Sequence, residues 1–464
     1  MITCPGCGGG LKFNIKFQQM VCDYCNVSYD PYAFDQKTSD AEENTYFDTT
    51  IYTCPQCGGE LLGTDNAAAS FCSFCGSSTI LYSRISKSKR PRYIIPFKKS
   101  KEDCKTAYSA RVKKALFLPK ELKKAEYIDG FRGIYMPYWS VKEVQKGPIV
   151  IKAKTSERHG DYIITKHYSI SGEIDASYDG ISHDASSSFY DNISERLAPY
   201  DIKERADFTP GFLSGFYADT ADVDSNAYIP ESTDFAVSSS YRSLIKHPEF
   251  KHYDIESDSV NKDSLHSYVE SVSATMYPVW FMSYRNKDRV AYATVNGQTG
   301  KVVADLPIAP FKYLVGSFII AAILFALFNF GMVITPKASM ITCGVISFIS
   351  LITSLVMGSS IKKQENIEND IGYRFRRSNS TKVDVSRIKS KKSSKIGYFT
   401  CLIACLIVFT IMLINPVYDY YYYGACIVCS VCIAISMIGL IKDYNILSTR
   451  KLPQFDRQGG DDRA

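Results

Sequence analysis

The last third of the chain contains four apolar stretches without a charged residue, separated by links of very different character. The stretches are residues 313–334, 338–361, 397–414 and 424–441. Each reaches or approaches the ~20 residues that a helix needs to cross the hydrocarbon core of a bilayer. Buried core helices are the alternative, but four such stretches in succession favour a transmembrane domain of four helices over residues 311–441.

The links between these stretches predict how the helices are oriented. The first link is only Thr335, Pro336 and Lys337, so we expect the first two helices to form an antiparallel pair. The middle link, residues 362–395, carries eleven Lys and Arg against four acidic residues, whereas the third link carries no Lys or Arg. The positive-inside rule therefore places the middle link in the cytoplasm. With four crossings, the N-terminal two-thirds and the tail, residues 442–464, are then cytoplasmic, which predicts a multi-pass protein of the cytoplasmic (inner) membrane.

The basic middle link also contains candidates for contact with anionic lipid headgroups. Each basic residue close to such a surface adds ~1 kcal/mol of attraction. The candidates are Arg374, Arg376, Arg377, Lys389, Lys391, Lys392 and Lys395. The alternative is that these residues only set the topology of the helices.

Residues 84–310 contain no long apolar run and predict a soluble, β-rich α+β domain. Ser100 can cap a helix, with Asp103 bonding back to it. Residues 149–153 and 162–170 are rich in β-branched and aromatic residues and predict strands. Trp139 and Trp280 each follow a proline, which we expect at a strand entry. Residues 290–303 predict a hairpin with a tight turn at Asn296 and Gly297.

Two groups of four cysteines near the N-terminus carry the most specific chemistry. Both have two Cys-x-x-Cys pairs separated by fourteen residues, and a Cys-Pro and a Cys-Gly-Gly sequence recur at the same places in each. The first quartet is Cys4, Cys7, Cys22 and Cys25, and the second is Cys54, Cys57, Cys72 and Cys75. Such a repeated spacing indicates two copies of one unit.

This spacing predicts a tetrahedral metal site in each quartet. Two residues between paired cysteines let both sulfurs face one ion, and a hairpin brings the two pairs together. The residue after the closing cysteine is expected in the left-handed backbone region, which suits glycine best and asparagine next. These residues are Gly8, Asn26, Gly58 and Gly76. We expect two structural Zn²⁺ ions, held by β zinc ribbons at residues 1–30 and 51–83, with a linker at 31–50; iron in a rubredoxin-like site is the alternative.

The remaining cysteines do not form a disulfide framework. Six of the seven lie in the apolar stretches, and only Cys104 lies in the soluble middle of the chain. Met1, Ile2 and Thr3 lead directly into the first metal turn, without the features of a signal peptide, which predicts a reducing compartment where thiolates bind metal. Cys426, Cys429 and Cys432 share one apolar stretch, where small residues usually serve helix packing.

No enzyme signature is found, so we expect a protein that is not an enzyme and has no small-molecule substrate. The segment from Gly297 to Lys301 has the wrong spacing for a phosphate-binding loop. His183 and Asp184 lie in a Ser-rich stretch that predicts a loop rather than a catalytic triad. Nucleic acid is not favoured as the main ligand, because residues 1–30 contain only Lys12 and Lys16 as basic residues and residues 51–83 contain none.

The combination resembles a family of bacterial membrane proteins with TFIIB-type zinc ribbons. The resemblance covers the two quartets, residues 135–139, 208–218 and 295–302, and the closing residues 452–464. Members often carry the name of a replication-restart helicase, but this chain has no ATP-binding loop. The resemblance implies a membrane anchor in an envelope-stress module that recruits a phage-shock-type membrane-remodelling protein.

The layout therefore predicts a non-enzymatic scaffold or adaptor that brings cytoplasmic protein partners to the membrane. It combines small binding modules at one end, an anchor at the other and no catalytic constellation between them. The alternative is a nucleic-acid-binding ribbon protein tethered to the membrane, since Arg84, Lys87, Lys89, Arg90 and Arg92 follow the second quartet.

Overall fold

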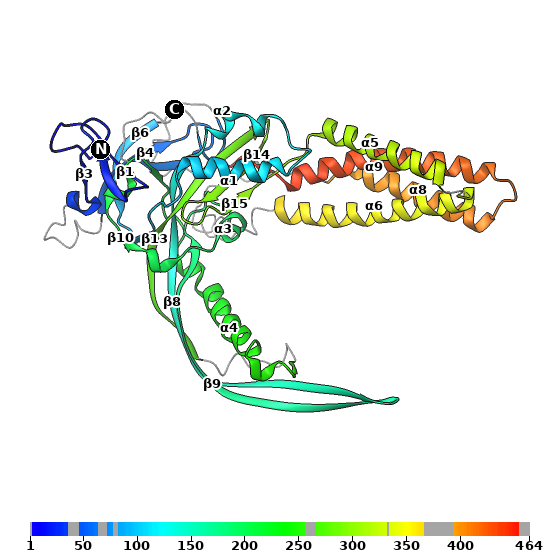
Figure 1. Ribbon diagram of the computed structural model, residues 1–464, viewed down its shortest axis with the longest axis horizontal. Helices are drawn as coiled ribbons and strands as arrows, with labels where there is room; N and C mark the ends of the chain where they lie inside the picture. Colours follow the sequence, from blue (N-terminus) through cyan, green and yellow to red (C-terminus); the bar gives the residue numbers. More distant parts are fainter. Residues whose placement is uncertain are drawn as a thin grey trace, which may run out of the picture.

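A computed structural model describes residues 2–35, 46–63, 72–77, 82–255, 266–331, 334–365 and 393–453. Figure 1 shows three parts: a sheet-rich body that contains the N-terminus, a long curved arm built mainly from β8 and β9, and a group of apolar helices on one side of the body. The four-cysteine groups, the sheet-rich middle and the four apolar helices occur in the order that the sequence predicts.

Two sheets are present in the described residues. The first is a small antiparallel sheet of β1 (Leu11–Asn14), β2 (Gln19–Cys22) and β3 (Ser28–Tyr29). The second has thirteen strands and forms the body and the arm. Its members are β4 (Tyr46–Thr53), β5 (Glu60–Gly63), β6 (Tyr82–Lys89), β7 (Tyr93–Ile94), β8 (Arg132–His159), β9 (Tyr162–Asp184), β10 (Ala206–Asp207), β11 (Tyr217–Ala218), β12 (Asp254–Ile255), β13 (His266–Asn286), β14 (Arg289–Asn296), β15 (Val302–Ala304) and β16 (Arg450–Lys451).

The strands that surround the second quartet belong to the large sheet. The sheet follows the order β10-β7-β13-β8-β11-β5-β4-β6, so β4, β5 and β6 form one edge of the body. The cysteine spacing predicts a separate ribbon for residues 51–83. In the structure, β5 instead pairs with β11, which in turn pairs with β8.

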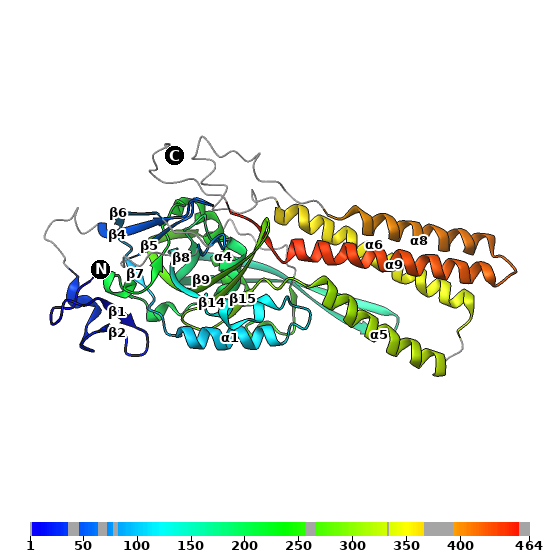
Figure 2. The same cartoon turned by 90° about the horizontal axis from the view of Figure 1, so that it is seen from above.

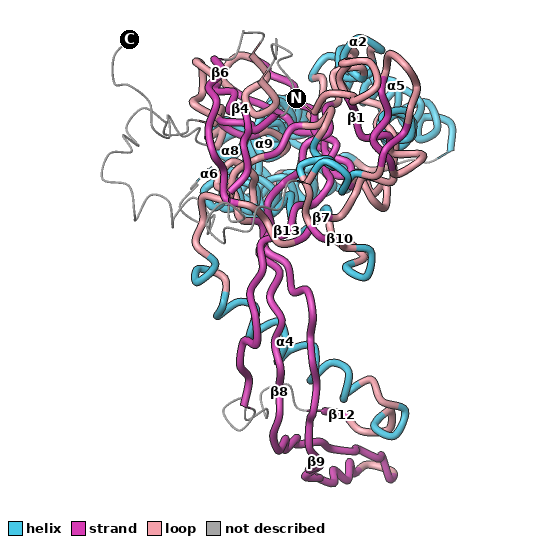
Figure 3. Tube along the Cα trace, turned by 90° about the vertical axis from the view of Figure 1, so that its left-hand side faces the viewer, coloured by secondary structure: helices cyan, strands magenta, loops and turns pink. Residues whose placement is uncertain are grey.

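The arm is an extension of the long strands beyond the body. Figure 3 shows β8, β9 and β13 leaving the body together, with α4 (Ile229–Ile245) beside them. Val141, Ile181 and Ala236 form a small apolar cluster between the arm and α4. The two predicted strands, residues 149–153 and 162–170, are parts of β8 and β9. These two strands pair antiparallel, from Tyr138 opposite Asp184 to His159 opposite Tyr162.

Helix α1 (Lys101–Lys113) begins where the sequence predicts. The Ser100 side chain accepts a hydrogen bond from the Asp103 amide (3.1 Å), and the Asp103 carboxylate accepts one from the Ser100 amide (2.9 Å). This capping box satisfies two amides that have no partner within the helix. One face of α1 is buried in the core, through Cys104, Tyr108 and Val112.

The prolines beside the tryptophans lie within strands, so the expectation of strand entries is wrong. Pro137 and Pro278 are inside β8 and β13, which pair antiparallel with Tyr135 opposite Pro278. Proline cannot donate to the ladder, but its carbonyl can accept. Pro137 accepts from the Ala185 amide and Pro278 from the Gly297 amide, both at 2.8 Å.

The predicted hairpin is confirmed, but its turn is longer than two residues. Strands β14 and β15 pair with Val295 opposite Val302, and the Asn296 amide donates to the Lys301 carbonyl (2.9 Å). Gly300, with φ of +80°, adopts the left-handed conformation of this turn. Gly297 is needed for space, because a Cβ there would lie 2.5 Å from the Phe97 ring.

Four helices are long and apolar enough to cross a membrane: α5 (Pro310–Gly331), α6 (Pro336–Glu365), α8 (Lys395–Ile414) and α9 (Tyr420–Leu447). Helices α6, α8 and α9 pack around a cluster that includes Met340, Val408 and Cys429. Helix α5 differs, because none of its apolar window is buried, and Figure 2 shows it diverging from the other three. Helices α5 and α6 run in opposite directions, but they diverge instead of forming the tight pair that the short link predicts.

Buried polar contacts join the helices to the body. The Arg289 side chain, on β14, pairs with Glu365 at the end of α6 (2.8 Å) and donates to the Ile446 carbonyl at the end of α9 (2.7 Å). Asp443 accepts bonds from Ser393 (2.9 Å) and from the Ser394 amide (2.7 Å), just before α8. The ends of α6 and α9 and the start of α8 thus lie on the side of the helices that faces the body.

Candidate metal centres

The first quartet lies in the small three-stranded unit, residues 2–35, which we call the first unit. Cys4 and Cys7 precede β1, Cys22 ends β2 and Cys25 follows it. The sulfur of Cys4 lies 3.6 Å from that of Cys25, and the sulfur of Cys7 lies 3.4 Å from that of Cys22. Cys4 and Cys22 are buried, whereas Cys7 and Cys25 are exposed.

The second quartet has the same geometry inside the body. The sulfur of Cys54 lies 3.8 Å from that of Cys75, and the sulfur of Cys57 lies 3.7 Å from that of Cys72. All four are buried in a core cluster with aromatic side chains that include Tyr52, Phe74, Tyr277 and Tyr292. The Tyr292 hydroxyl, on β14, donates to the Phe74 carbonyl (2.7 Å), which fixes the turn between Cys72 and Cys75 to the centre of the sheet.

These distances fit one tetrahedral ion in each quartet. Metal–sulfur bonds of about 2.3 Å at tetrahedral angles place sulfurs about 3.8 Å apart. The four ligand atoms of each quartet all lie within 4.8 Å of one another. The eight cysteines therefore form two groups that could each hold a metal ion.

All four Cys-x-x-Cys turns share one backbone arrangement. In each, the amide four residues after the first cysteine donates to the carbonyl of that cysteine, at 2.8 to 3.0 Å. The donors are Gly8, Asn26, Gly58 and Gly76, with φ of +74°, +57°, +75° and +70°. The left-handed conformation predicted for these residues is confirmed, and it turns the chain so that both sulfurs of a pair face the same point.

The pKa values of the thiols within each quartet are shifted in opposite directions. A hydrogen bond from the Tyr29 hydroxyl lowers the pKa of Cys4 to about 6. In the second quartet, hydrogen bonds from Cys57 and Cys72 lower the pKa of Cys54, and the bond to Cys54 raises the pKa of Cys57. Four thiolates so close together repel one another, so full deprotonation requires a cation at the centre.

Residues 208–216 hold the first unit against the body, a role that the sequence does not predict. The Phe13 amide donates to the Ser214 carbonyl (3.0 Å), and the Phe13 ring lies edge-on to Phe212 (5.1 Å between centroids). A Cβ on Gly211 would lie 2.5 Å from the Pro31 carbonyl oxygen, so only glycine allows this approach. The Phe-Thr-Pro-Gly-Phe sequence was visible as a motif, but its partner is more than 170 residues away.

The other candidate residues stand apart from these centres. Arg374, Arg376, Arg377, Lys389, Lys391 and Lys392 lie outside the described residues, and Lys395 is exposed at the start of α8. Cys429 on α9 is buried against Ala404 of α8, and Cys426 and Cys432 are partly buried. Among the described residues, the metal-ligand groups are the two quartets alone.

His183 and Asp184 end β9 rather than forming part of a loop. The His183 ring stacks on Tyr228 at 4.9 Å, and burial lowers its pKa to about 4. This histidine is held in its neutral form inside the body.

The molecule is thus defined by two four-cysteine groups with metal-binding geometry and by four helices suited to a membrane. Comparison with known proteins gives its relationship. The chain is 31% identical over 243 residues to the uncharacterized protein YdjG of Bacillus subtilis (strain 168), a match that covers 50% of this chain and 68% of that protein. It belongs to the same family as YdjG. No family model matches the chain, and no solved structure does.

Proposed function

We propose that this protein is a non-enzymatic membrane adaptor in which two structural Zn²⁺ ions shape the cytoplasmic part and the first unit binds a partner protein. The observation that carries the proposal is the contrast between the two quartets. The second is buried in the body, whereas the first is presented at the opposite end of the body from α5 (Figures 1 and 2).

Zinc is favoured by the ligand set. Four sulfurs at tetrahedral spacing leave no coordination position for water or substrate, which is typical of structural sites. Purified protein is expected to contain two zinc ions per chain, one for each quartet. Metal analysis combined with absorption spectroscopy distinguishes zinc from iron, because a rubredoxin-like centre is strongly coloured and a zinc centre is not.

The orientation we propose is cytoplasmic for both ends of the chain. Arg289 of the body pairs with Glu365 and donates to the Ile446 carbonyl at the end of α9, and Asp443 in the same last turn of α9 accepts a bond from Ser393, so both described ends of the basic link lie at the body side of the helices. The body and the basic link therefore share one side of the membrane, and the positive-inside rule assigns that side to the cytoplasm. There the quartets stay reduced and available to metal.

The first unit exposes apolar side chains at both ends of its small sheet, which we propose serve a protein partner. Tyr24 (88% exposed) and Val27 lie at the end with the cysteines, and Phe17 (62% exposed) lies in the turn between β1 and β2. Exposed aromatic residues on a rigid platform are typical of protein-binding surfaces. The nearby Lys12 is paired with Asp23 (2.5 Å), which reduces the positive charge available for nucleic acid. By the family resemblance, the proposed partner is a membrane-remodelling protein of the phage-shock type.

Photocrosslinking in intact cells tests this assignment. A crosslinking amino acid is placed at Phe17 or Tyr24, and Phe235, which is 55% exposed on α4, serves as the matched control. The proposal predicts the same discrete protein adduct from both positions in the first unit and its absence from the control position. Equal adducts from all three positions, or none from residues 17 and 24, would contradict it.

A further inference from the structure

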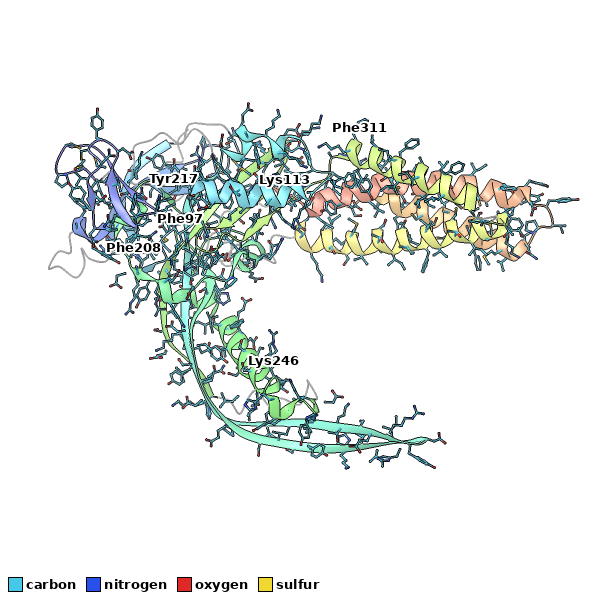
Figure 4. The ribbon with its side chains drawn as sticks, in the orientation of Figure 1. Phe97, Lys113, Phe208, Tyr217, Lys246 and Phe311 are labelled. Carbon is cyan, nitrogen blue, oxygen red and sulfur yellow. The ribbon has the colours of Figure 1, made fainter. Side chains whose placement is uncertain are left out.

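The loop that follows α1, residues 114–120, lies at the point where α5 begins and the chain leaves the body. The Ala309 amide donates to the Phe117 carbonyl (2.7 Å), and the Lys312 ammonium donates to the Leu118 carbonyl (2.7 Å). The Phe117 ring lies edge-on to Tyr313, with 5.1 Å between centroids. Figure 4 shows Lys113 at the end of α1 and Phe311 at the neighbouring start of α5.

This contact reaches into the apolar part of α5. A Cβ on Gly316 would lie 2.6 Å from the Phe117 ring, so the ring is seated directly against the helix backbone. Gly316 is inside the window of α5 that is apolar enough to cross a membrane. If α5 crosses the membrane, the loop is therefore at the level of the bilayer surface.

The side chains of the loop match that position. Leu116 is 74% exposed, whereas Leu118, on the other side of Phe117 in the sequence, is buried. Residues 111–124 contain six basic residues and one acidic residue, Glu121. The basic residues, all exposed, are Arg111, Lys113, Lys114, Lys120, Lys123 and Lys124. An exposed apolar residue in a short segment rich in positive charge is the pattern of a peripheral contact with anionic lipids.

We propose that this loop binds the anionic phospholipid surface of the membrane that α5 enters, with Leu116 inserted among the headgroups and Lys113, Lys114 and Lys120 paired with phosphates. The contact fixes the body relative to the bilayer at a second point, separate from the junction of α6 and α9. It involves α1 and the loop, not the basic link, and it is independent of whether the first unit binds a partner. It rests on α5 crossing the membrane.

Tryptophan quenching in the full-length protein tests the contact. Leu116→Trp is compared with Phe17→Trp, an exposed position in the first unit, which lies at the end of the body opposite α5 (Figure 1), and both variants retain Trp139 and Trp280. The proteins are reconstituted in phosphatidylcholine bilayers, with or without phosphatidylglycerol, that carry bromine near the headgroups. We expect strong quenching at position 116 and little at position 17. Equal quenching at the two positions would overturn the proposal.

A charge reversal isolates the electrostatic part. Each basic residue near an anionic surface contributes roughly fivefold to surface affinity. In the Leu116→Trp background, Lys113→Glu with Lys114→Glu is expected to bring the ratio of quenching in anionic and neutral bilayers down to about one. The matched control, Lys16→Glu with Lys203→Glu, changes exposed lysines away from the loop and should leave the ratio unchanged. An unchanged ratio in the loop variant would overturn the role of anionic lipid.

Discussion

The two quartets have the same spacing and turn geometry but different surroundings. In the first unit, the residues between Cys22 and Cys25 are Asp23 and the exposed Tyr24. At the same place in the second quartet are Ser73 and Phe74, both buried. The cysteines specify the metal geometry, whereas the residues between them determine whether the centre lies at the surface or in the core.

The difference changes what a metal ion stabilises. The first ion would organise a small sheet that holds to the body through residues 208–216. The second would lie within the core cluster that includes Tyr277 of β13 and Tyr292 of β14. These two strands pair with each other, and β14 contacts the end of α9 through Arg289. We therefore expect the loss of the first ion to have local effects and the loss of the second to affect the whole body.

Cysteine replacement is the strongest test of this contrast. Cys57→Ser is expected to destabilise the body by more than ~4 kcal/mol, because a buried metal and its core contacts are lost together. Cys7→Ser should leave the body folded and retain one of the two ions. Limited proteolysis and metal analysis of the purified full-length variants measure both outcomes. Similar cleavage patterns for the two variants would remove the distinction.

Chelation should separate the two ions in time. The first quartet has two exposed sulfurs, Cys7 and Cys25, whereas removal of the second ion requires the core to open. A difference of only ~1.4 kcal/mol in opening free energy gives a tenfold difference in rate. We expect a fast phase and a slow phase, with Cys7→Ser lacking the fast one. A single phase, or loss of the slow phase in Cys7→Ser, would reverse the assignment.

Local signals in the sequence predicted local structure well. The left-handed residues of the metal turns, the capping box of Ser100 and the four apolar helices are all as expected, because short spacings determine each of them. The site was likewise visible, since pairs of cysteines two residues apart identify their own partners.

Contacts between distant segments could not be predicted in this way. Nothing near the second quartet shows that β5 will pair with β11, or that Tyr292 will bond to Phe74. Strand β8 continues through Pro137, Gly147 and Pro148, residues that usually interrupt strands, because β13 and β9 pair with it on either side. Helix α5 packs against Phe117 in the loop after α1 and diverges from the other three helices, which hydropathy alone does not predict.

Arg90 links the first unit to the body, and its substitution tests whether the first unit depends on the body for its stability. It forms an ion pair with Asp35, at the end of the first unit, and donates to the Phe208 carbonyl (2.9 Å). The Asp35 side chain is only 6% exposed, so Arg90→Gln leaves a nearly buried carboxylate without its cation. We expect a loss of about 3 kcal/mol, seen as faster amide exchange in β1 and β2 with little change in β14.

A matched ion pair at the surface provides the control for Arg90. Lys12 and Asp23 lie in the same unit but are more than half exposed, at 56% and 60%. Lys12→Gln should therefore cost less than ~1 kcal/mol. Equal effects of the two substitutions would mean that the Arg90 pair does not hold the first unit in place.

Acid provides the last and smallest test, through His183 in the body. Burial lowers the pKa of His183 to about 4, and its Nε2 atom is buried without a hydrogen-bond partner in the described residues. The folded body thus favours the neutral ring, whereas the unfolded chain binds a proton near the ordinary value of 6.5. Its contribution to stability is full above that value and is lost as the pH falls toward 4. By linkage, the loss at about pH 5 is on the order of 2 kcal/mol.

His183→Phe keeps the stacking on Tyr228 and removes the titration, so the variant should lose less stability than the wild type over this range. Because both proteins contain the same cysteines, acid release of metal cancels in the difference. Amide exchange in β14 should show the difference and exchange in β1 should not; a difference confined to β1 would place the acid-sensitive group in the wrong region.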